Sequence, residues 1–463
     1  MTRTFITGFE AVIPLPINRE NGCNNKYNNN CNNYAVFKND KEIIHIEKIN
    51  FIAFVIISRN SLINAVKISG GFANKQSAEE HFQISFFIEE NKKDLIEFAG
   101  ALIKENEKSG FFKFNIKIEK YKKISDGRII KFLLEYFDYV IFFLAVGAVI
   151  RLIAPYLKNK FKDPGIIAVD EAGKFVVSLL SGHIGGANRL SEEISGYLET
   201  SVPVITTATD SENKFSIDAF AEKFDFYMED AKKKVKDYNR ASLMDESFEI
   251  VLEDNFKAGD IKRYVKDFNN AERIKIKEVS DFKKLKLNPE NFNNNQKTII
   301  VAIKKDLNGL SKSKNIAILR PKRLVLGIGC NRSTGLNEIE DFVSEIFEKN
   351  GIVLNSIRNI ASIYNKKNER GLLDFGFKYG RFIDFYSKEE INAFMESFVL
   401  KNTQASAEYL KSPSFKYTGA YSVCEPCAMM SAGNYNGAAM LVPKQKKGNV
   451  TASVAVIKDI KIK

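Results

Sequence analysis

The sequence predicts a multi-domain protein of the α/β class. Its 463 residues exceed the roughly 100–200 residues of one ordinary domain. Apolar residues make up 44% and charged residues 27%, which is the balance of a globular chain. Strand and helix patterns alternate in two separated blocks, as in layered α/β domains. We therefore expect an N-terminal α/β domain, a small middle domain and a C-terminal α/β domain.

Composition marks the boundaries between these parts. The stretch from Asn21 to Asn33 holds eight asparagines in thirteen positions and cannot build a core. After the first block, Lys, Asp and Asn become frequent and the periodicity weakens. The expected segments are an Asn-rich extension over 1–50, an N-terminal α/β domain over 51–213, a middle domain or linker over 214–320 and a C-terminal α/β domain over 321–463.

The first block opens with the apolar run 51–57, a strand, followed by a helical pattern from Leu62 to Ile68. Residues 165–169 and 174–178 are the arms of an expected hairpin, with glycine at its turn. A helix is expected to run to about Glu199, and a last strand over 202–206. The second block predicts a strand over 323–329, a helix over 336–349 and a closing strand over 451–457.

Several classes of protein are disfavoured. The longest apolar run, 139–150, is well short of the ~20 residues that cross a bilayer. The N-terminus lacks the pattern of a secretory signal. Five cysteines are an odd and sparse set, unlike a disulfide framework. We therefore expect reduced thiols, no membrane partner and a cytoplasmic location.

The chain carries a formal net charge of +12, which attracts polyanions. Nucleic acid and a substrate bearing many carboxylates both meet that description. Lysines spread over solvated faces by a codon bias would give the same number, so the charge alone does not choose between these readings.

The first candidate site lies in Ser181-Gly-His-Ile-Gly-Gly-Ala-Asn188, ahead of a helix. Glycines at 182, 185 and 186 allow the backbone to approach a ligand, and a helix N-terminus favours anions. His183 is one of three histidines and suits proton transfer. Asn188 and Ser181 are candidate ligand contacts, although helix capping and turn formation are equally common uses of these residue types.

Further candidates flank this segment. Gly147 and Arg151 follow a buried strand, at the carboxyl edge where open α/β sheets bind ligands, and Arg151 can clamp a carboxylate. Thr207 and Asp210 follow the last strand of the domain. We expect them at the same edge as Gly147 and Arg151.

The second candidate site begins at Gly327-Ile-Gly329-Cys330, after a strand and before a helix. It fails as a dinucleotide fingerprint because Arg332 stands where glycine or alanine is needed. The sequence contains no G-x-x-x-x-G-K-[ST] loop either. A tight turn remains, with Gly329 and Cys330 as candidate substrate contacts.

Farther along, Cys424-Glu-Pro-Cys427 begins a short helix. A lone C-x-x-C is a weak signal, and no second ligand pair supports a zinc site. Glu425 is a candidate general base, with helix capping as the alternative. Lys444 and Lys446 are expected on a turn before the last strand, where they grip carboxylates or remain solvated.

Both blocks resemble the cobalt-precorrin-5A hydrolase family. The resemblance rests on LAVGAVIRLIAP, on DPGIIAVDEAGKFVVSLLSGHIGGANRLSEEI and ITTATD, and on GIGCNRSTGLNEI, IASIYNKKNERGLLDF, SVCEPCAMMSAG and LVPKQKKGNVTASVAVI. It covers about residues 51–210 and 321–460, and the middle segment and the first 50 residues depart from it.

The resemblance implies an enzyme that opens the lactone of a contracted cobalt tetrapyrrole and expels a two-carbon piece as acetaldehyde, giving cobalt-precorrin-5B. It implies no cofactor and no protein-held metal, since cobalt arrives within the substrate. His183 and Glu425 are then the acid/base candidates, the 182–188 amides and Asn188 the anion contacts, and Arg151, Lys444 and Lys446 the carboxylate clamps.

The implied partner is a corrinoid intermediate, with no nucleic acid. Contact with other cobalamin-pathway enzymes and a homodimer both stay open. Two competing functions remain: a non-catalytic module that binds or channels the intermediate, and a Rossmann-type reductase or methyltransferase, against which the missing glycine fingerprint argues.

Overall fold

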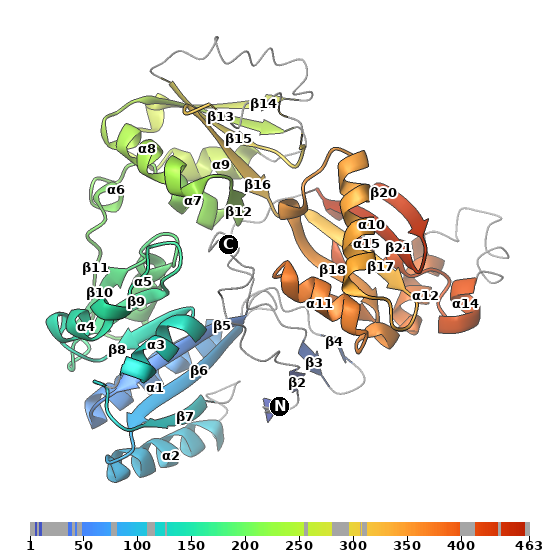
Figure 1. Cartoon of the computed structure of the whole chain (residues 1–463). Helices are drawn as coiled ribbons and strands as arrows, with labels where there is room; N and C mark the ends of the chain where they lie inside the picture. The colour runs from blue at the N-terminus through green and yellow to red at the C-terminus, as the bar shows by residue number, and fades with distance from the viewer. Residues whose placement is uncertain are drawn as a thin grey trace. The chain divides into compact units, whose positions relative to one another are not determined.

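A computed structural model gives the fold of the chain as two compact units, Met1–Glu212 and Asn213–Lys463, which are described separately (Figure 1). No helix in the described part of the chain is long and apolar enough to span a membrane. The structure describes residues 5–6, 9–11, 36–38, 42–43, 49–75, 81–108, 116–125, 127–253, 258–279, 296–305, 307, 313–398, 413–433 and 437–458.

The first 50 residues contribute a small antiparallel sheet of four short strands in the order β1-β2-β3-β4. The predicted Asn-rich loop at 21–33, with Cys23 and Cys31, lies outside the described residues, as does His45. The strands are β1 (Phe5–Ile6), β2 (Phe9–Ala11), β3 (Val36–Lys38) and β4 (Glu42–Ile43).

A seven-stranded sheet forms the rest of the first unit, in the order β11-β10-β9-β8-β5-β6-β7. Its strands are β5 (Ile49–Ile56), β6 (His81–Glu89), β7 (Ile116–Tyr121), β8 (Tyr139–Phe142), β9 (Gly165–Val169), β10 (Phe175–Leu180) and β11 (Val202–Val204). Its helices are α1 (Arg59–Lys75), α2 (Lys93–Lys108), α3 (Gly127–Tyr136), α4 (Val146–Ile153), the 3-10 turn η1 (Ala154–Tyr156), α5 (Ala187–Tyr197) and α6 (Ala208–Ser211). The predicted α/β class and the predicted hairpin, β9 with β10, are confirmed.

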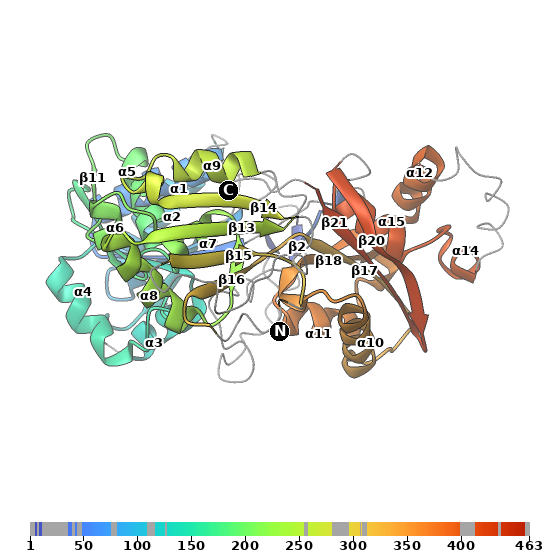
Figure 2. The same cartoon turned by 90° about the horizontal axis from the view of Figure 1, so that it is seen from above.

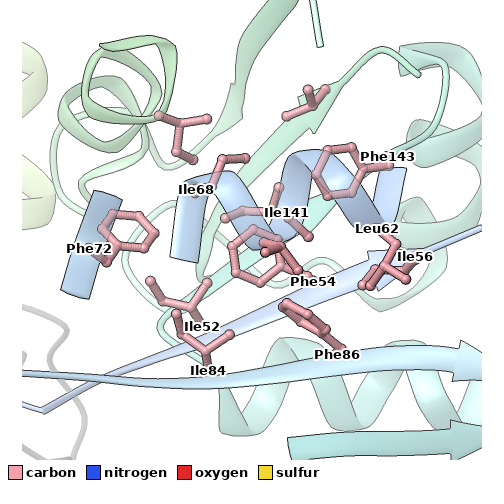
Figure 3. Packing of buried hydrophobic residues seen from close by; sticks show 14 of the residues in the cluster. Ile52, Phe54, Ile56, Leu62, Ile68, Phe72, Ile84, Phe86, Ile141 and Phe143 are labelled. Carbon is pink, nitrogen blue, oxygen red and sulfur yellow. The ribbon is translucent and has the colours of Figure 1, made fainter. Parts of the chain in front are cut away.

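Helices cover both faces of this sheet. Ile52, Phe54 and Ile56 of β5 pack in one cluster with residues of α1, α2 and α5, as Figure 3 shows for α1. The alternate residues Ala53 and Val55 pack with α3 and α4 in a second cluster. Because both faces are buried, β5 is a continuous apolar run rather than an alternating one.

Strand direction within the sheet decides where its loops lie. β5 to β9 are parallel, but β10 runs antiparallel to β9, and β11 is parallel to β10. Leu180, near the end of β10, pairs with Ile166, near the start of β9. The loops that follow β10 and β11 therefore lie at the edge where β8 and β9 begin.

The middle segment of the chain, which begins the second unit, is a folded five-stranded sheet rather than a linker, in the order β12-β16-β15-β13-β14. Figure 2 shows β13, β14, β15 and β16 of this sheet. All neighbouring pairs are parallel except β12 with β16. The elements are α7 (Ile217–Lys223), β12 (Phe226–Met228), α8 (Ala231–Leu243), β13 (Ser247–Glu253), α9 (Ala258–Val265), η2 (Ala271–Arg273), β14 (Ile274–Val279), β15 (Gln296–Val301) and β16 (Ile316–Pro321).

A second five-stranded sheet ends the chain, in the order β19-β18-β17-β21-β20. β17, β18 and β19 are parallel, and the hairpin β20–β21 pairs antiparallel to β17. The elements are β17 (Leu324–Cys330), α10 (Leu336–Lys349), η5 (Leu354–Ser356), β18 (Ile357–Ile363), η6 (Tyr364–Lys366), α11 (Arg370–Lys378), β19 (Ile383–Tyr386), α12 (Lys388–Phe398), α14 (Pro413–Thr418), α15 (Cys424–Ser431), β20 (Ala438–Lys447) and β21 (Val450–Ile457).

Only Lys322 and Arg323 separate β16 from β17, and both are buried cations. Lys322 Nζ lies 2.8 Å from Asp225 Oδ1, and the Arg323 guanidinium donates to the carbonyls of Ile457 and Lys458. The Val353 amide also donates to the Ile303 carbonyl at 3.1 Å. Hydrogen bonds therefore join the two sheets of the second unit.

Candidate active site

The loop after β10 carries the first candidate residues. A β-bulge lies between Ser178 and Leu180 of β10, and Ser181, just after the strand, adopts a left-handed backbone with φ of 57°. A serine rarely takes this conformation, and such local strain is common near functional sites. The Ser181 hydroxyl donates to the Asp163 carbonyl at 3.0 Å, which fixes the turn.

The glycines of this loop face protein rather than open space. A Cβ on Gly182 would lie 2.5 Å from Asn188 Oδ1, and one on Gly185 would lie 2.4 Å from Ser181 Cβ. Gly186 caps α5 with φ of 72°, so Asn188 is not the cap. The amides of residues 185, 186, 187 and 188 all donate to carbonyls of the same loop. These four amide N–H groups already donate hydrogen bonds within the loop, which disfavours the anion site predicted at the 182–188 amides.

His183 lies beside Asp210, with Nε2 2.7 Å from Oδ2. The same oxygen accepts a hydrogen bond from Asn188 Nδ2 at 2.6 Å. Asn188 also donates to Thr207 Oγ1 at 3.1 Å and accepts from Ser178 Oγ at 2.6 Å. These five side chains, here called the His183 group, join β10, its following loop, α5 and the start of α6.

The imidazole of the His183 group is largely enclosed, while its carboxylate reaches solvent. The His183 side chain is 7% exposed and that of Asp210 36%. A histidine whose ring is held by a carboxylate is the arrangement used for general acid–base catalysis.

Glu192 is a neighbour of this group that sequence reasoning missed. It lies four residues after Asn188 on α5, so both share one helix face. Burial, then the charges of Asp210 and Glu193, raise the pKa of Glu192. Glu193 itself pairs with Arg189 at 2.7 Å. The i to i+4 spacing from Asn188 was the available signal.

The structure corrects the expectation that Thr207 and Asp210 share an edge with Gly147 and Arg151. Gly147 follows the carboxyl end of β8, whereas Asp210 follows β11, which runs in the opposite direction. The two sets therefore lie at opposite edges of the sheet. The reversal comes from the β9–β10 hairpin.

Gly147 and Arg151 nevertheless occupy a place suited to ligands. β6 follows β5 in the chain and pairs with one edge of β5, whereas β8 pairs with the other edge of β5. The strand order therefore reverses between β5 and β8, and these two strands flank a topological switch point. Open α/β sheets bind ligands at the carboxyl ends of such strands. Arg151 is exposed, and its guanidinium donates to the Gly147 carbonyl at 3.0 Å.

In the second unit, Gly327 and the predicted Gly329 of β17 are both in close contact with neighbouring elements. A Cβ on Gly329 would lie 2.6 Å from Thr451 Oγ1, and one on Gly327 would lie 2.0 Å from the Cys424 carbonyl oxygen. Gly327 therefore allows α15 to pack on the sheet, and Gly329 leaves room for the Thr451 side chain of β21. These two contacts account for the G-x-G pattern without a nucleotide.

Glu425, Lys444 and Lys446 gather where α15 begins. Glu425 Oε1 accepts from the Lys444 amide at 3.0 Å. Lys446 of β20 is directly opposite Thr451 of β21 in the strand register, and the Thr451 hydroxyl lies on the α15 side of the sheet. The expectation that both lysines lie on a turn is wrong, because β20 extends through them to Lys447. Within the described residues, no carboxylate pairs with either ammonium group.

Cys330 lies on the face of β17 opposite to that of Gly329, since successive residues of a strand point to opposite faces. Burial raises the pKa of its thiol to about 11, although the nearby Lys366 lowers it. Lys366 pairs with Glu369 at 3.0 Å, and Glu369 accepts from the Ser333 amide at 3.0 Å. Lys366 and Glu369 were missed by sequence reasoning. Their signal was their position just after β18, at the same edge as Cys330.

The C-x-x-C cysteines are buried thiols. Burial raises the pKa of Cys424 to about 11 and that of Cys427 well above its ordinary value. In the part of the chain that the structure describes, no three His, Cys, Asp or Glu side chains are grouped to hold a metal ion.

Known protein families match both the part of the chain that contains the His183 group and the part that contains Glu425. One family model, described as cobalamin synthesis G N-terminal, matches residues 128–210, and another, cobalamin synthesis G C-terminus, matches residues 324–455. A cobalt-precorrin-5A hydrolase of Priestia megaterium is 34% identical over 329 residues, which are 70% of this chain and 80% of the relative. The chain belongs to the cobalt-precorrin-5A hydrolase family. The resemblance read from the motifs is confirmed.

The chain is also similar to two further proteins. A cobalt-precorrin-5A hydrolase of Salmonella typhimurium is 31% identical over 238 residues, covering 50% of this chain and 62% of the relative. A solved homologue of cobalamin biosynthesis protein G from Sulfolobus solfataricus covers 89% of this chain and 97% of its own, with 21% identity and a TM-score of 0.30. In this member of the hydrolase family, the N-terminal match contains the His183 group and Arg151, and the C-terminal match contains Glu425 and both lysines.

Proposed function

We propose that this chain is a cobalt-precorrin-5A hydrolase. The observation that carries the proposal is the 34% identity to the Priestia megaterium enzyme of that name, spread over 80% of its length. Both matched blocks contain clustered polar residues that such a reaction requires. The cobalt is then part of the substrate rather than a metal held by this chain.

The proposed reaction opens the lactone of the contracted tetrapyrrole and releases acetaldehyde, so it is formally a carbon–carbon hydrolysis. A base removes a proton from water, whose oxygen adds to the lactone carbonyl. The acyl carbon–oxygen bond then breaks, leaving a carboxylate and an alkoxide. As the alkoxide becomes the carbonyl of acetaldehyde, the adjacent carbon–carbon bond breaks and its electron pair passes to the macrocycle.

Within this scheme, His183 is our first choice for the base, because Asp210 holds its ring at 2.7 Å and the rest of the group fixes Asp210. Glu425 is the second candidate, since it stands beside two lysines that suit a substrate ringed with carboxylates. Arg151, Lys444 and Lys446 are the proposed carboxylate clamps.

The test is anaerobic incubation of the full chain with cobalt-precorrin-5A, with trapping of the aldehyde and mass measurement of the macrocycle. Stoichiometric acetaldehyde is expected. His183→Gln and Glu425→Gln would then identify the base, and Glu199→Gln, an exposed carboxylate just beyond α5, is the control. Binding without acetaldehyde would instead indicate a module that holds or channels the intermediate.

A further inference from the structure

Every hydrogen-bonding hydrogen of the Asn188 side chain is used within the protein. Nδ2 has two hydrogens, and they go to Thr207 Oγ1 at 3.1 Å and Asp210 Oδ2 at 2.6 Å. Oδ1 accepts from Ser178 at 2.6 Å. Asn188 is only 9% exposed, so the substrate contact suggested by the sequence would have to displace one of these bonds.

The chemistry of Asp210 determines how its two partners are oriented. An ionised carboxylate only accepts hydrogen bonds, so the amide nitrogen of Asn188, and not its oxygen, must face Asp210. The same rule requires the proton of a neutral His183 ring to be on Nε2, which lies 2.7 Å from Oδ2. The lone pair of that tautomer is on Nδ1.

We propose that Asn188 and Asp210 are positioning residues that hold His183 in its Nε2–H tautomer, in which Nδ1 is the basic nitrogen of the ring. This rests on the proposed role of His183 in the hydrolase. Asn188 fixes Asp210, and Asp210 fixes the imidazole.

The backbone around the group is built for this arrangement. Gly182 has no Cβ, which leaves room for the Asn188 amide 2.5 Å from where that atom would be. The Asn188 amide N–H also bonds the Gly182 carbonyl at 3.0 Å. Asn188 is therefore held at both its main chain and its side chain before any substrate arrives, which is the preorganisation that proton transfer requires.

The tautomer can be read directly by NMR from the ¹⁵N shifts of the ring nitrogens. The chain has three histidines, so the spectrum is simple, and His183→Gln assigns the signal of interest. We expect Nε2 protonated and Nδ1 unprotonated in the wild-type chain, and a mixture of tautomers in Asn188→Leu and Asp210→Asn. A wild-type ring protonated at Nδ1, or an unchanged spectrum in Asn188→Leu, would overturn the proposal.

Kinetics provide a second readout. Asn188→Leu should lower kcat on the order of 10²-fold while KM stays within a few-fold, as for a mispositioned catalytic group. Thr207→Val, which removes only the 3.1 Å bond, should have a smaller effect in the same direction. A rise in KM with unchanged kcat would show that Asn188 binds substrate, against the proposal.

Ser191→Ala is the matched control on α5. Ser191 is fully buried three residues from Asn188, and its hydroxyl has no partner among the described residues, so tautomer and kcat should be unchanged. If the wild-type chain releases no acetaldehyde, the proposed function fails, whereas the tautomer measurement still decides the positioning of His183. Thermal melting of each variant separates misfolding from either result.

Discussion

The Cα of Gly327 faces the carbonyl oxygen of Cys424 so closely that a Cβ on Gly327 would lie 2.0 Å from that oxygen. The obstacle is backbone, which cannot rotate away as a side chain can. Gly327→Ala must therefore push α15 off the sheet. We expect a loss of about 1–3 kcal/mol of stability, typical of an overpacked core, seen as a lower Tm.

Gly259→Ala is the control in the same unit. Gly259 lies in α9 with no atom within 4 Å of the added Cβ, so alanine should stabilise the chain by about 0.4–1 kcal/mol. Equal Tm values for both variants would mean that α15 does not pack on β17 as described.

Lys444 and Lys446 should contribute to substrate capture through charge. We expect the double change Lys444→Gln with Lys446→Gln to raise KM about 2–10-fold at low ionic strength and to matter less as salt screens the carboxylates. Lys447→Gln is the control, because Lys447 already pairs with Glu345 on the other face of the sheet. An equal effect of Lys447→Gln would indicate general attraction rather than a clamp.

Glu192 should make substrate binding depend on pH. Its pKa is raised, chiefly by burial and next by Asp210, so it stays protonated above its ordinary pKa and becomes a second negative charge only at higher pH. Because that charge repels carboxylates, KM should rise by about 2–5-fold as pH increases through the raised pKa.

Glu192→Gln should flatten the KM profile, and Glu199→Gln, beyond the end of α5, should leave it as in the wild type. A rise of KM toward low pH, or an identical profile in Glu192→Gln, would contradict the role of this carboxyl group.

The three described cysteines should be unreactive in the native chain. With a pKa of about 11, only on the order of 10⁻⁴ of the Cys330 or Cys424 thiol is ionised at pH 7. Iodoacetamide at neutral pH should leave both, and Cys427, largely unmodified, while labelling in urea modifies all three. Peptide mapping by mass spectrometry measures each site, and rapid native labelling of Cys330 would show an activated thiolate instead.

Much of the fold could be predicted because local patterns and tertiary burial agree. The helix predicted at 336–349 is α10, and both arms of the predicted hairpin are strands of the sheet. The middle sheet was harder to predict. Four of its strands, β13 to β16, pair in parallel, so their pairing depends on contacts between distant residues that no short pattern reveals.

The sequence indicated which residues belong to the candidate site better than it indicated what each of them does. His183, Asn188, Thr207 and Asp210 were all candidates, but side-chain partners fixed by the fold are needed to see that Asn188 serves Asp210 rather than a ligand. The edge assigned to Asp210 was wrong although the hairpin had been predicted, because its reversal of strand direction was not followed through to β11.

The β9–β10 hairpin divides a stretch that is contiguous in sequence, from Gly147 to Asp210. Arg151 and the His183 group, for which we propose separate roles, lie at opposite edges of one sheet. Their effects on the free energy of the transition state should then add independently, as for distant sites without shared partners. With the proposed roles, a change at Arg151 that alters carboxylate binding should leave proton transfer at His183 unchanged, and the reverse.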